Sequence, residues 1–114
     1  MNLEKIEQIA KKAGMEALKI YNQDFSIEYK DDNSPLTEAD KVSNEIICSE
    51  LSKIANYPIL SEENKTIPYE DRKDWEYYWC IDPIDGTKEF IKKNGEWTIN
   101  IALIHKDTPI LGVV

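Results

Sequence analysis

The first twenty-two residues carry the clearest hydrophobic pattern in the chain. Apolar residues recur there at steps of three and four: Leu3, Ile6, Ala10, Ala13, Ala17 and Ile20. Lys and Glu fill much of the remaining sequence, so this spacing places the apolar side chains on one face of an amphipathic helix. The polar stretch 22–24 interrupts the pattern, and we predict that the helix ends near Asn22.

A second helical pattern begins at Thr37. Thr37 and Asp40 are three residues apart and resemble a capping box, in which the two side chains satisfy the free N–H groups at a helix start. The apolar positions that follow predict the buried face: Val42, Ile46, Ile47, Leu51 and Ile54. Between the two helices, alternation over 25–30 predicts a short strand, and the composition of 31–35 predicts a loop that includes Pro35.

The rest of the chain is dominated by short apolar runs. We predict strands at 57–60, 75–81, 97–105 and 109–114, with a surface loop over 64–74. Residues 87–93 could form a short helix, and turns are predicted at Asn94-Gly95 and around 106–107. The expected fold class is α+β, with two N-terminal helices packed on a largely antiparallel sheet.

Composition limits the possible functions. The chain has 114 residues, room for one domain, and its 22 acidic against 14 basic residues give a net charge of −8. This charge argues against binding to nucleic acid or to an acidic membrane surface. No segment reaches the ~18 apolar residues of a membrane span, and the charged N-terminus is unlike a signal peptide. We therefore expect a cytoplasmic protein, with Cys48 and Cys80 as small buried thiols that match no zinc or redox spacing.

The segment 82–87, Asp-Pro-Ile-Asp-Gly-Thr, is the first candidate for chemistry. Asp82 and Asp85 at a strand end can point into one pocket, and Gly86 lets the backbone come close to a ligand. N–H groups of Gly86 and Thr87 at a helix start would suit a phosphate. The competing interpretation is an ordinary turn, in which Asp85 caps a helix and Asp82 makes a loop hydrogen bond.

A second acidic pair, Glu62 and Glu63, follows another predicted strand. If the two strands are neighbours, Glu62 would converge with Asp82 and Asp85, and the repulsion would raise at least one pKa unless a cation neutralises it. An all-oxygen set without His or Cys suits Mg²⁺ better than Zn²⁺. His105, the single histidine, is expected at the surface or at a strand end.

Four ordered blocks resemble the inositol monophosphatase superfamily of lithium-sensitive, Mg²⁺-dependent phosphatases. The run WCIDPIDGTKEF at 79–90 is similar to its metal-binding signature, and SPLTEAD at 34–40, SEE at 61–63 and NGEWTINIAL at 94–103 agree with it. The continuation Lys88-Glu89-Phe90 resembles the 3'(2'),5'-bisphosphate nucleotidase branch more than the inositol phosphatases. The resemblance covers nearly the whole chain and implies the first lobe of an αβαβα layered fold.

The resemblance also implies roles for individual residues. It assigns Mg²⁺ to the side chains of Glu62, Asp82 and Asp85 and to the backbone carbonyl of Ile84, with Asp82 bridging two ions. Gly86 and Thr87 would contact the phosphate through their backbone, near Asp85. Asp40 and the Thr87 hydroxyl would orient and activate the attacking water, alongside Glu62. Capping of the second helix is an equally good role for Asp40, and the two can coexist.

Further assignments from the resemblance concern the reaction and the partners. The expected cofactor is Mg²⁺, two or three ions, with Li⁺ as inhibitor, and the expected substrate is a small phosphorylated molecule such as 3'-phosphoadenosine 5'-phosphate. Lys30 falls near a loop that covers the site in this family, and Lys88, Lys92 and Lys93 could add positive charge or simply face solvent.

Residues 1–114 are expected to form the N-terminal metal-binding lobe of a longer phosphatase. The chain ends inside the apolar run 111–114, and the family's second lobe, with a further Asp ligand, has no counterpart here. We expect weak or absent hydrolysis by these residues alone, and self-association through exposed apolar surface. The alternatives are an inositol or other sugar-phosphate phosphatase, and a non-catalytic lobe that only binds metal or serves a structural role.

Overall fold

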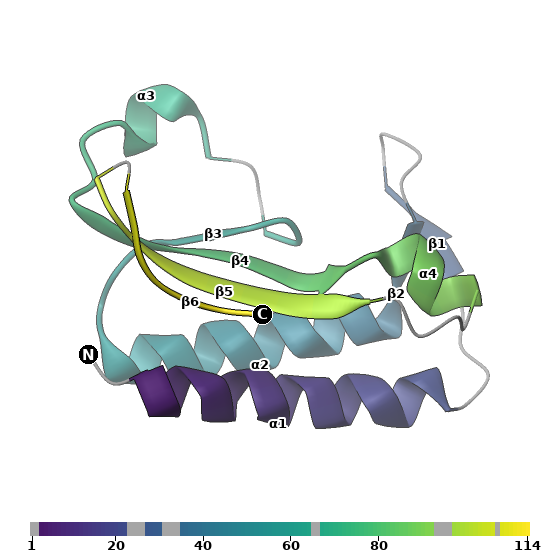
Figure 1. Ribbon diagram of the computed structural model, residues 1–114. Helices are drawn as coiled ribbons and strands as arrows, with labels where there is room; N and C mark the ends of the chain where they lie inside the picture. The colour runs from purple at the N-terminus through teal and green to yellow at the C-terminus, as the bar shows by residue number, and fades with distance from the viewer. Residues whose placement is uncertain (1–2, 23–26, 31–34, 65–66, 93–96, 107) are drawn as a thin grey trace.

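Two layers make up the protein, one of helices and one of strands. The computed structural model describes residues 3–22, 27–30, 35–64, 67–92, 97–106 and 108–114. Helices α1 (Leu3–Tyr21) and α2 (Glu38–Ile54) lie side by side on one face of a four-stranded sheet (Figure 1). The strands, in sheet order, are β3 (Ile59–Ser61), β4 (Tyr77–Asp85), β5 (Thr98–His105) and β6 (Thr108–Val113). Only β3 and β4 run parallel, so the predicted α+β class with a largely antiparallel sheet is confirmed.

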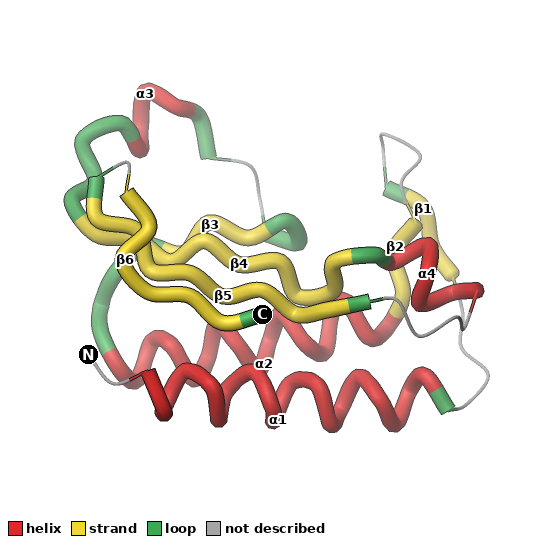
Figure 2. Tube along the Cα trace, in the orientation of Figure 1, coloured by secondary structure: helices red, strands yellow, loops and turns green. Residues whose placement is uncertain are grey.

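Four smaller elements flank the sheet. They are β1 (Ile27–Tyr29), β2 (Pro35–Thr37), α3 (Tyr69–Arg72) and α4 (Thr87–Lys92). The β1–β2 pair and α4 lie at one end of the molecule, and α3 lies at the other (Figure 2). The prediction of loop at Pro35 is wrong, because Pro35 opens β2, a strand position that does not require its missing N–H. The predicted loop over 64–74 contains the single turn of α3, which is too short to produce a periodic pattern.

The main core lies between the helices and the sheet. Ile6 and Ala13 of α1 pack with Leu51 of α2 against Trp79 of β4 and Ile101 of β5. Leu3 departs from the predicted helix face, since it is 40% exposed in the first turn of α1. None of the described helices is both long and apolar enough to cross a bilayer.

The alternation of β4 explains an error about the cysteines. Trp79 and Ile81 face the helices and are buried, so Cys80 between them points to the opposite face of the sheet and is exposed. Cys48, on α2, is partly buried. The prediction of two buried thiols is therefore wrong for Cys80 and only partly right for Cys48. The turn predicted at Asn94-Gly95 lies outside the described residues, as do residues 31–34 and Asp107.

Two glycines give a contrasting pair of stability predictions. Gly14 lies inside α1, and a Cβ there would meet Ile99 Cδ1 at 3.7 Å, an ordinary contact. Gly14→Ala should raise the free energy of unfolding by up to about 1 kcal/mol, because alanine is the better helix former. Gly86 has φ of 94°, so Gly86→Ala should lower it by about 1–2 kcal/mol. Urea denaturation measures both, and a gain for Gly86→Ala would contradict this backbone conformation.

Candidate metal and phosphate site

The sequence predicts a strand that ends at residue 81, just before Asp82. In the structure β4 continues to Asp85, so both aspartates belong to the end of the strand. Asp82 pairs with Asn100 and Asp85 pairs with Thr98, so β4 contains one more residue than β5 between these two pairs. Such a β-bulge changes which side chains face together. Residues three apart normally point to opposite faces of a sheet, but here both align with partners two apart on β5. The bulge therefore brings Asp82 and Asp85 onto the same face.

Buried contacts hold this strand end in place. The Ser43 hydroxyl of α2 donates a hydrogen bond of 2.8 Å to the Pro83 carbonyl. Ile84 is buried in a second apolar cluster with Phe90 of α4 and Ala17 of α1. On the exposed side, Asn100 Nδ2 donates to Asp85 Oδ2 at 3.2 Å. The bulge is thus fixed by contacts to α2, α1, α4 and β5, most of which the sequence did not reveal.

Asp40 lies beneath the same strand end and is 1% exposed. Its Oδ2 accepts hydrogen bonds from the Thr37 N–H at 2.9 Å and from the Thr37 hydroxyl at 2.6 Å. The predicted capping box is therefore confirmed. Asp40 Oδ1 accepts a further hydrogen bond of 2.8 Å from the Thr87 hydroxyl. One carboxylate thus caps α2 and also contacts Thr87, which lies 47 residues further along the chain.

Gly86 and Thr87 connect β4 to α4. The positive φ of Gly86 makes the sharp change of direction that a side chain would disfavour. The Thr87 hydroxyl lies 3.4 Å from the Ile84 carbonyl, and the Phe90 N–H donates to the Gly86 carbonyl at 2.9 Å. The residues expected to contact phosphate therefore directly follow those expected to contact metal.

Glu62 and Glu63 reach the site from the neighbouring strand. Because β3 runs parallel to β4 with Ser61 opposite Ile81, the residues just after β3 lie beside Asp82. Burial, together with the charges of Asp85, Glu62 and Glu63, raises the pKa of Asp82 to about 6. A hydrogen bond from the Ile84 backbone opposes this rise. Asp85, Glu62 and Glu63 thus each lie within electrostatic reach of Asp82, although Glu62 and Asp85 are themselves exposed.

Lys30 approaches the site from the end of β1. Its Nζ donates to Glu63 Oε1 at 2.6 Å, and the Glu63 side chain is 9% exposed. Burial lowers the pKa of Lys30, but the hydrogen bond to Glu63 and the charges of Glu63, Asp40 and Glu62 outweigh it and leave the pKa raised. Sequence reasoning placed Lys30 near the site but did not identify Glu63 as its partner, since nothing in either local pattern links them.

The residues present suit a divalent cation in donor type and in charge. Asp82, Asp85 and Glu62 supply carboxylate oxygens, and their mutual repulsion is what a bound cation would relieve. Within the ranges that the structure describes, no group of three such side chains is already gathered to hold an ion. Asp82 is partly buried, whereas the other two predicted ligands, Glu62 and Asp85, are exposed.

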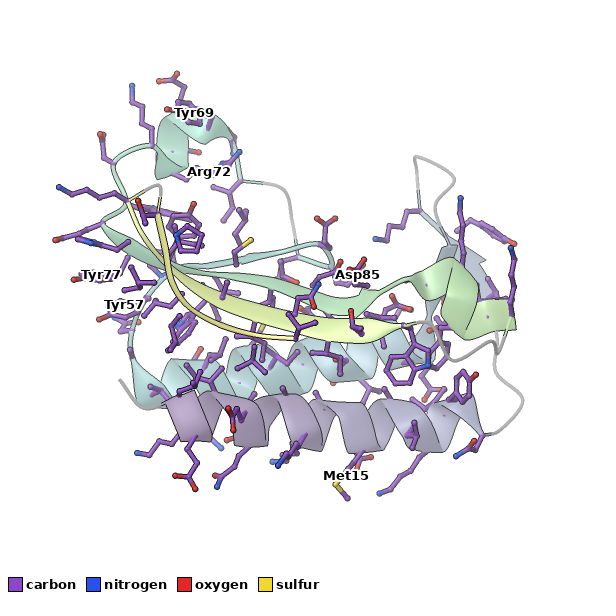
Figure 3. The ribbon with its side chains drawn as sticks, in the orientation of Figure 1. Met15, Tyr57, Tyr69, Arg72, Tyr77 and Asp85 are labelled. Atoms are coloured by element: carbon purple, nitrogen blue, oxygen red, sulfur yellow. The ribbon has the colours of Figure 1, made fainter. Side chains whose placement is uncertain are left out.

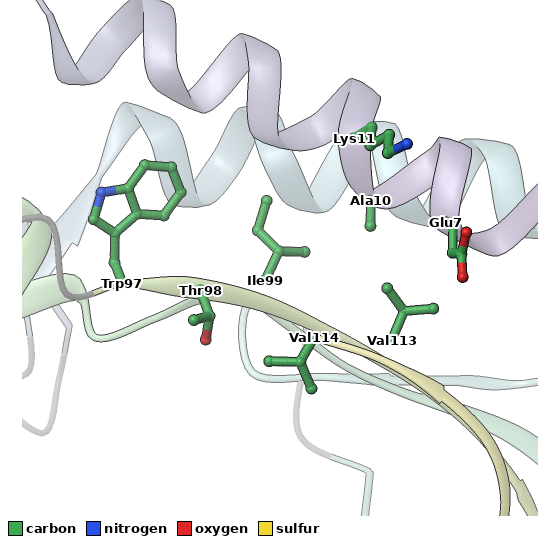
Figure 4. Close-up of a pocket in the computed structure, with 8 residues that line it drawn as sticks. All are labelled: Glu7, Ala10, Lys11, Trp97, Thr98, Ile99, Val113 and Val114. Atoms are coloured by element: carbon green, nitrogen blue, oxygen red, sulfur yellow. The ribbon is translucent and has the colours of Figure 1, made fainter.

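The surface also carries a groove away from this site and a cavity next to it. A groove of about 500 Å³ runs between α1 and the strands β5 and β6, with Ala10, Trp97 and Val113 among its lining residues (Figure 4). It contains none of the candidate acids. A smaller cavity of about 220 Å³ adjoins the site, because Glu62 lines it together with Arg72 and Cys80. His105, as expected, lies at a strand end, where it stacks on Tyr77 with ring centres 4.4 Å apart.

The two layers of helices and strands and the acidic end of β4 fit a known class of protein. The family model described as "Inositol monophosphatase family" matches residues 2–114, and the chain belongs to this family.

Similar proteins point to one branch of the family. The chain is 48% identical to the 3'(2'),5'-bisphosphate nucleotidase CysQ of Buchnera aphidicola, over 98% of this chain and 43% of that protein. It is 44% identical to the CysQ of Escherichia coli K12, over 98% of this chain and 46% of the other. The crystal structure of CysQ from Bacteroides thetaiotaomicron matches with a TM-score of 0.81 and 44% identity, over 98% of this chain and 41% of that one. The chain therefore spans less than half the length of the relatives it matches.

Proposed function

We propose that the chain supplies the metal- and phosphate-binding part of a Mg²⁺-dependent phosphomonoesterase that removes the 3'-phosphate from 3'-phosphoadenosine 5'-phosphate. The observation that carries the proposal is the 2.8 Å hydrogen bond from the Thr87 hydroxyl to the buried Asp40, beside the bulge that aligns Asp82 with Asp85. The names of the CysQ relatives support this substrate over others.

The proposed roles follow from these contacts. Glu62, Asp82, Asp85 and the Ile84 carbonyl would hold Mg²⁺, which supplies an acidified water and neutralises the phosphoryl oxygens. The Thr87 hydroxyl donates its hydrogen bond to Asp40 Oδ1, so its oxygen lone pairs remain available to accept a hydrogen bond from the attacking water. Backbone N–H groups of Gly86 and Thr87 would bind the phosphate. Lys30 would keep Glu63 paired, which limits the negative charge that faces the substrate.

Removal of the Thr87 hydroxyl tests the water-orienting role. Thr87→Val keeps the size of the side chain, and we expect it to slow Mg²⁺-dependent phosphate release by about 10²-fold or more. Thr108→Val, at the exposed start of β6, is the matched control and should leave the rate unchanged. Equal rates for wild type and Thr87→Val would remove Thr87 from the mechanism.

Substrate choice separates the alternatives. We expect 3'-phosphoadenosine 5'-phosphate, monitored by ³¹P NMR, to bind in the presence of Mg²⁺ and not after chelation, and inositol 1-phosphate to bind more weakly. The reverse preference would favour an inositol monophosphatase. Binding of Mg²⁺ without either phosphate ester would favour a non-catalytic metal-binding lobe. Lithium sensitivity and a cytoplasmic location remain predictions.

A further inference from the structure

A small cavity lies at the end of the molecule where α3 packs over the sheet. Its volume is about 50 Å³. Three cationic and three aromatic side chains of the described chain line it: Arg72, Lys73, Lys106, Tyr69, Trp75 and Tyr78. No acidic residue is among them, although the chain as a whole carries a net charge of −8. A concave surface whose charged lining residues are all cations attracts anions.

Arg72 supplies a second, independent observation. Its Nε atom is buried and has no hydrogen-bond partner among the described groups. A buried donor without an acceptor is costly, and an ion or a water that accepts its hydrogen bond would remove that cost. The Arg72 side chain borders both the 50 Å³ cavity and the 220 Å³ cavity beside Glu62. A guanidinium in this position can bind two oxygens of one phosphate in parallel.

The cavity's size suggests which part of a ligand enters it. One water needs about 10–15 Å³ by this measure, so the cavity holds a group of a few oxygen atoms. That matches a phosphate and is far below the roughly 300 Å³ of a pocket for a whole small molecule. The remainder of any phosphate ester must therefore lie outside the cavity.

The rim of the cavity offers aromatic surface for that remainder. Tyr69 is 65% exposed, and the Arg72 guanidinium lies 5.8 Å from its ring centre. Trp75 and Tyr78 are in ring contact, with centres 5.6 Å apart. Exposed aromatic rings beside bound phosphate are the arrangement on which nucleotide bases stack.

We propose that this cavity is a binding site for a nucleoside monophosphate, with the phosphate on Arg72 and Lys106 and the base on the ring of Tyr69. None of the candidate metal ligands lines this cavity, and Tyr69 and Arg72 lie at the α3 end of the sheet, away from Asp85 (Figure 3). Lys73 contributes less charge, since it is paired with Glu70 at 2.9 Å. Binding here requires no metal, so the proposal does not depend on the proposed function.

The test is a titration of the chain with AMP in the presence of a chelator, followed by NMR of the Arg72 Nε–H and Trp75 indole signals. We expect both signals to shift, with millimolar or tighter affinity. Arg72→Gln and Lys106→Gln should each weaken binding by about tenfold or more. Lys53→Gln, an exposed lysine on α2, is the control and should bind as the wild type does. Asp82→Asn should also bind AMP normally.

Two partial ligands, ribose 5-phosphate and adenosine, test the phosphate and base contacts separately. Ribose 5-phosphate, which lacks the base, should bind less tightly than AMP, and adenosine without phosphate should not shift the Arg72 signal. Equal binding of ribose 5-phosphate and AMP would overturn the role of the aromatic rim. The proposal would be wrong if neither signal shifted at about 10 mM AMP. It would also be wrong if binding needed Mg²⁺ and disappeared in Asp82→Asn. Unchanged urea denaturation curves would show that Arg72→Gln and Lys106→Gln remain folded.

Discussion

Mg²⁺ is expected to raise the unfolding temperature of the wild-type chain, and Asp82→Asn is expected to abolish this effect while making the metal-free chain more stable. The reason is the repulsion around Asp82, whose pKa is raised to about 6 by burial and by Asp85, Glu62 and Glu63. Neutralising Asp82 relieves that repulsion but removes a candidate ligand. A merely structural aspartate would lose stability with or without metal.

The pH dependence of the metal-free chain follows from the same shift. The pKa of Asp82 is higher in the folded chain than its ordinary value of 3.8, so the folded state holds this proton more tightly. The contribution of Asp82 to stability is therefore greatest below pH 4 and is lost as the pH rises through about 6. Asp82→Asn should remove this part of the pH dependence.

Thermal unfolding with and without Mg²⁺ measures both effects. A ligand at a hundred times its dissociation constant stabilises the folded state by about 2.7 kcal/mol, and we expect a wild-type gain of that order at saturating Mg²⁺. Asp74→Asn, an exposed aspartate before β4, should keep the Mg²⁺ response. If Asp82→Asn responded to Mg²⁺ as strongly as the wild type, Asp82 would not be a ligand.

Phe90→Ala is expected to destabilise the chain by about 3–5 kcal/mol, the usual loss when a buried phenylalanine is truncated. Phe90 is fully buried, and the centre of its ring lies 5.1 Å from the ring centres of both Tyr21 and Trp97. The ring centres of Tyr21 and Trp97 are 5.8 Å apart. It joins α4 to α1 beneath the candidate site. Its loss should also weaken the contact between Thr87 and Asp40, because α4 begins at Thr87.

Urea denaturation compares this variant with two others. Phe90→Leu should lose much less stability, because it keeps most of the apolar volume. Tyr69→Ala should change stability little, since that ring is 65% exposed. A loss below about 1 kcal/mol for Phe90→Ala would show that the small cluster of Ala17, Ala39, Ile84 and Phe90 does not hold α4 in place.

Much of the framework could be predicted from local sequence. The step of three and four predicted α1 to within one residue of its end, and the Thr37–Asp40 spacing predicted the start of α2. Strands β5 and β6 also appeared close to their predicted limits. These features depend on neighbours within a few positions, so the periodicity of side chains along the chain is enough to specify them. The exceptions, Pro35 and α3, belong to elements of three and four residues.

The sequence by itself thus determined the helices, most strands, the order of the acidic segments and the family resemblance. Only the tertiary structure decided how the acids face one another. The bulge in β4 depends on its register with β5, and the hydrogen bonds Thr87–Asp40, Ser43–Pro83 and Lys30–Glu63 join residues that are 33 to 47 positions apart. The raised pKa of Asp82 likewise reflects burial and charges from another strand. Such contacts depend on strand register and helix packing, which no local pattern encodes.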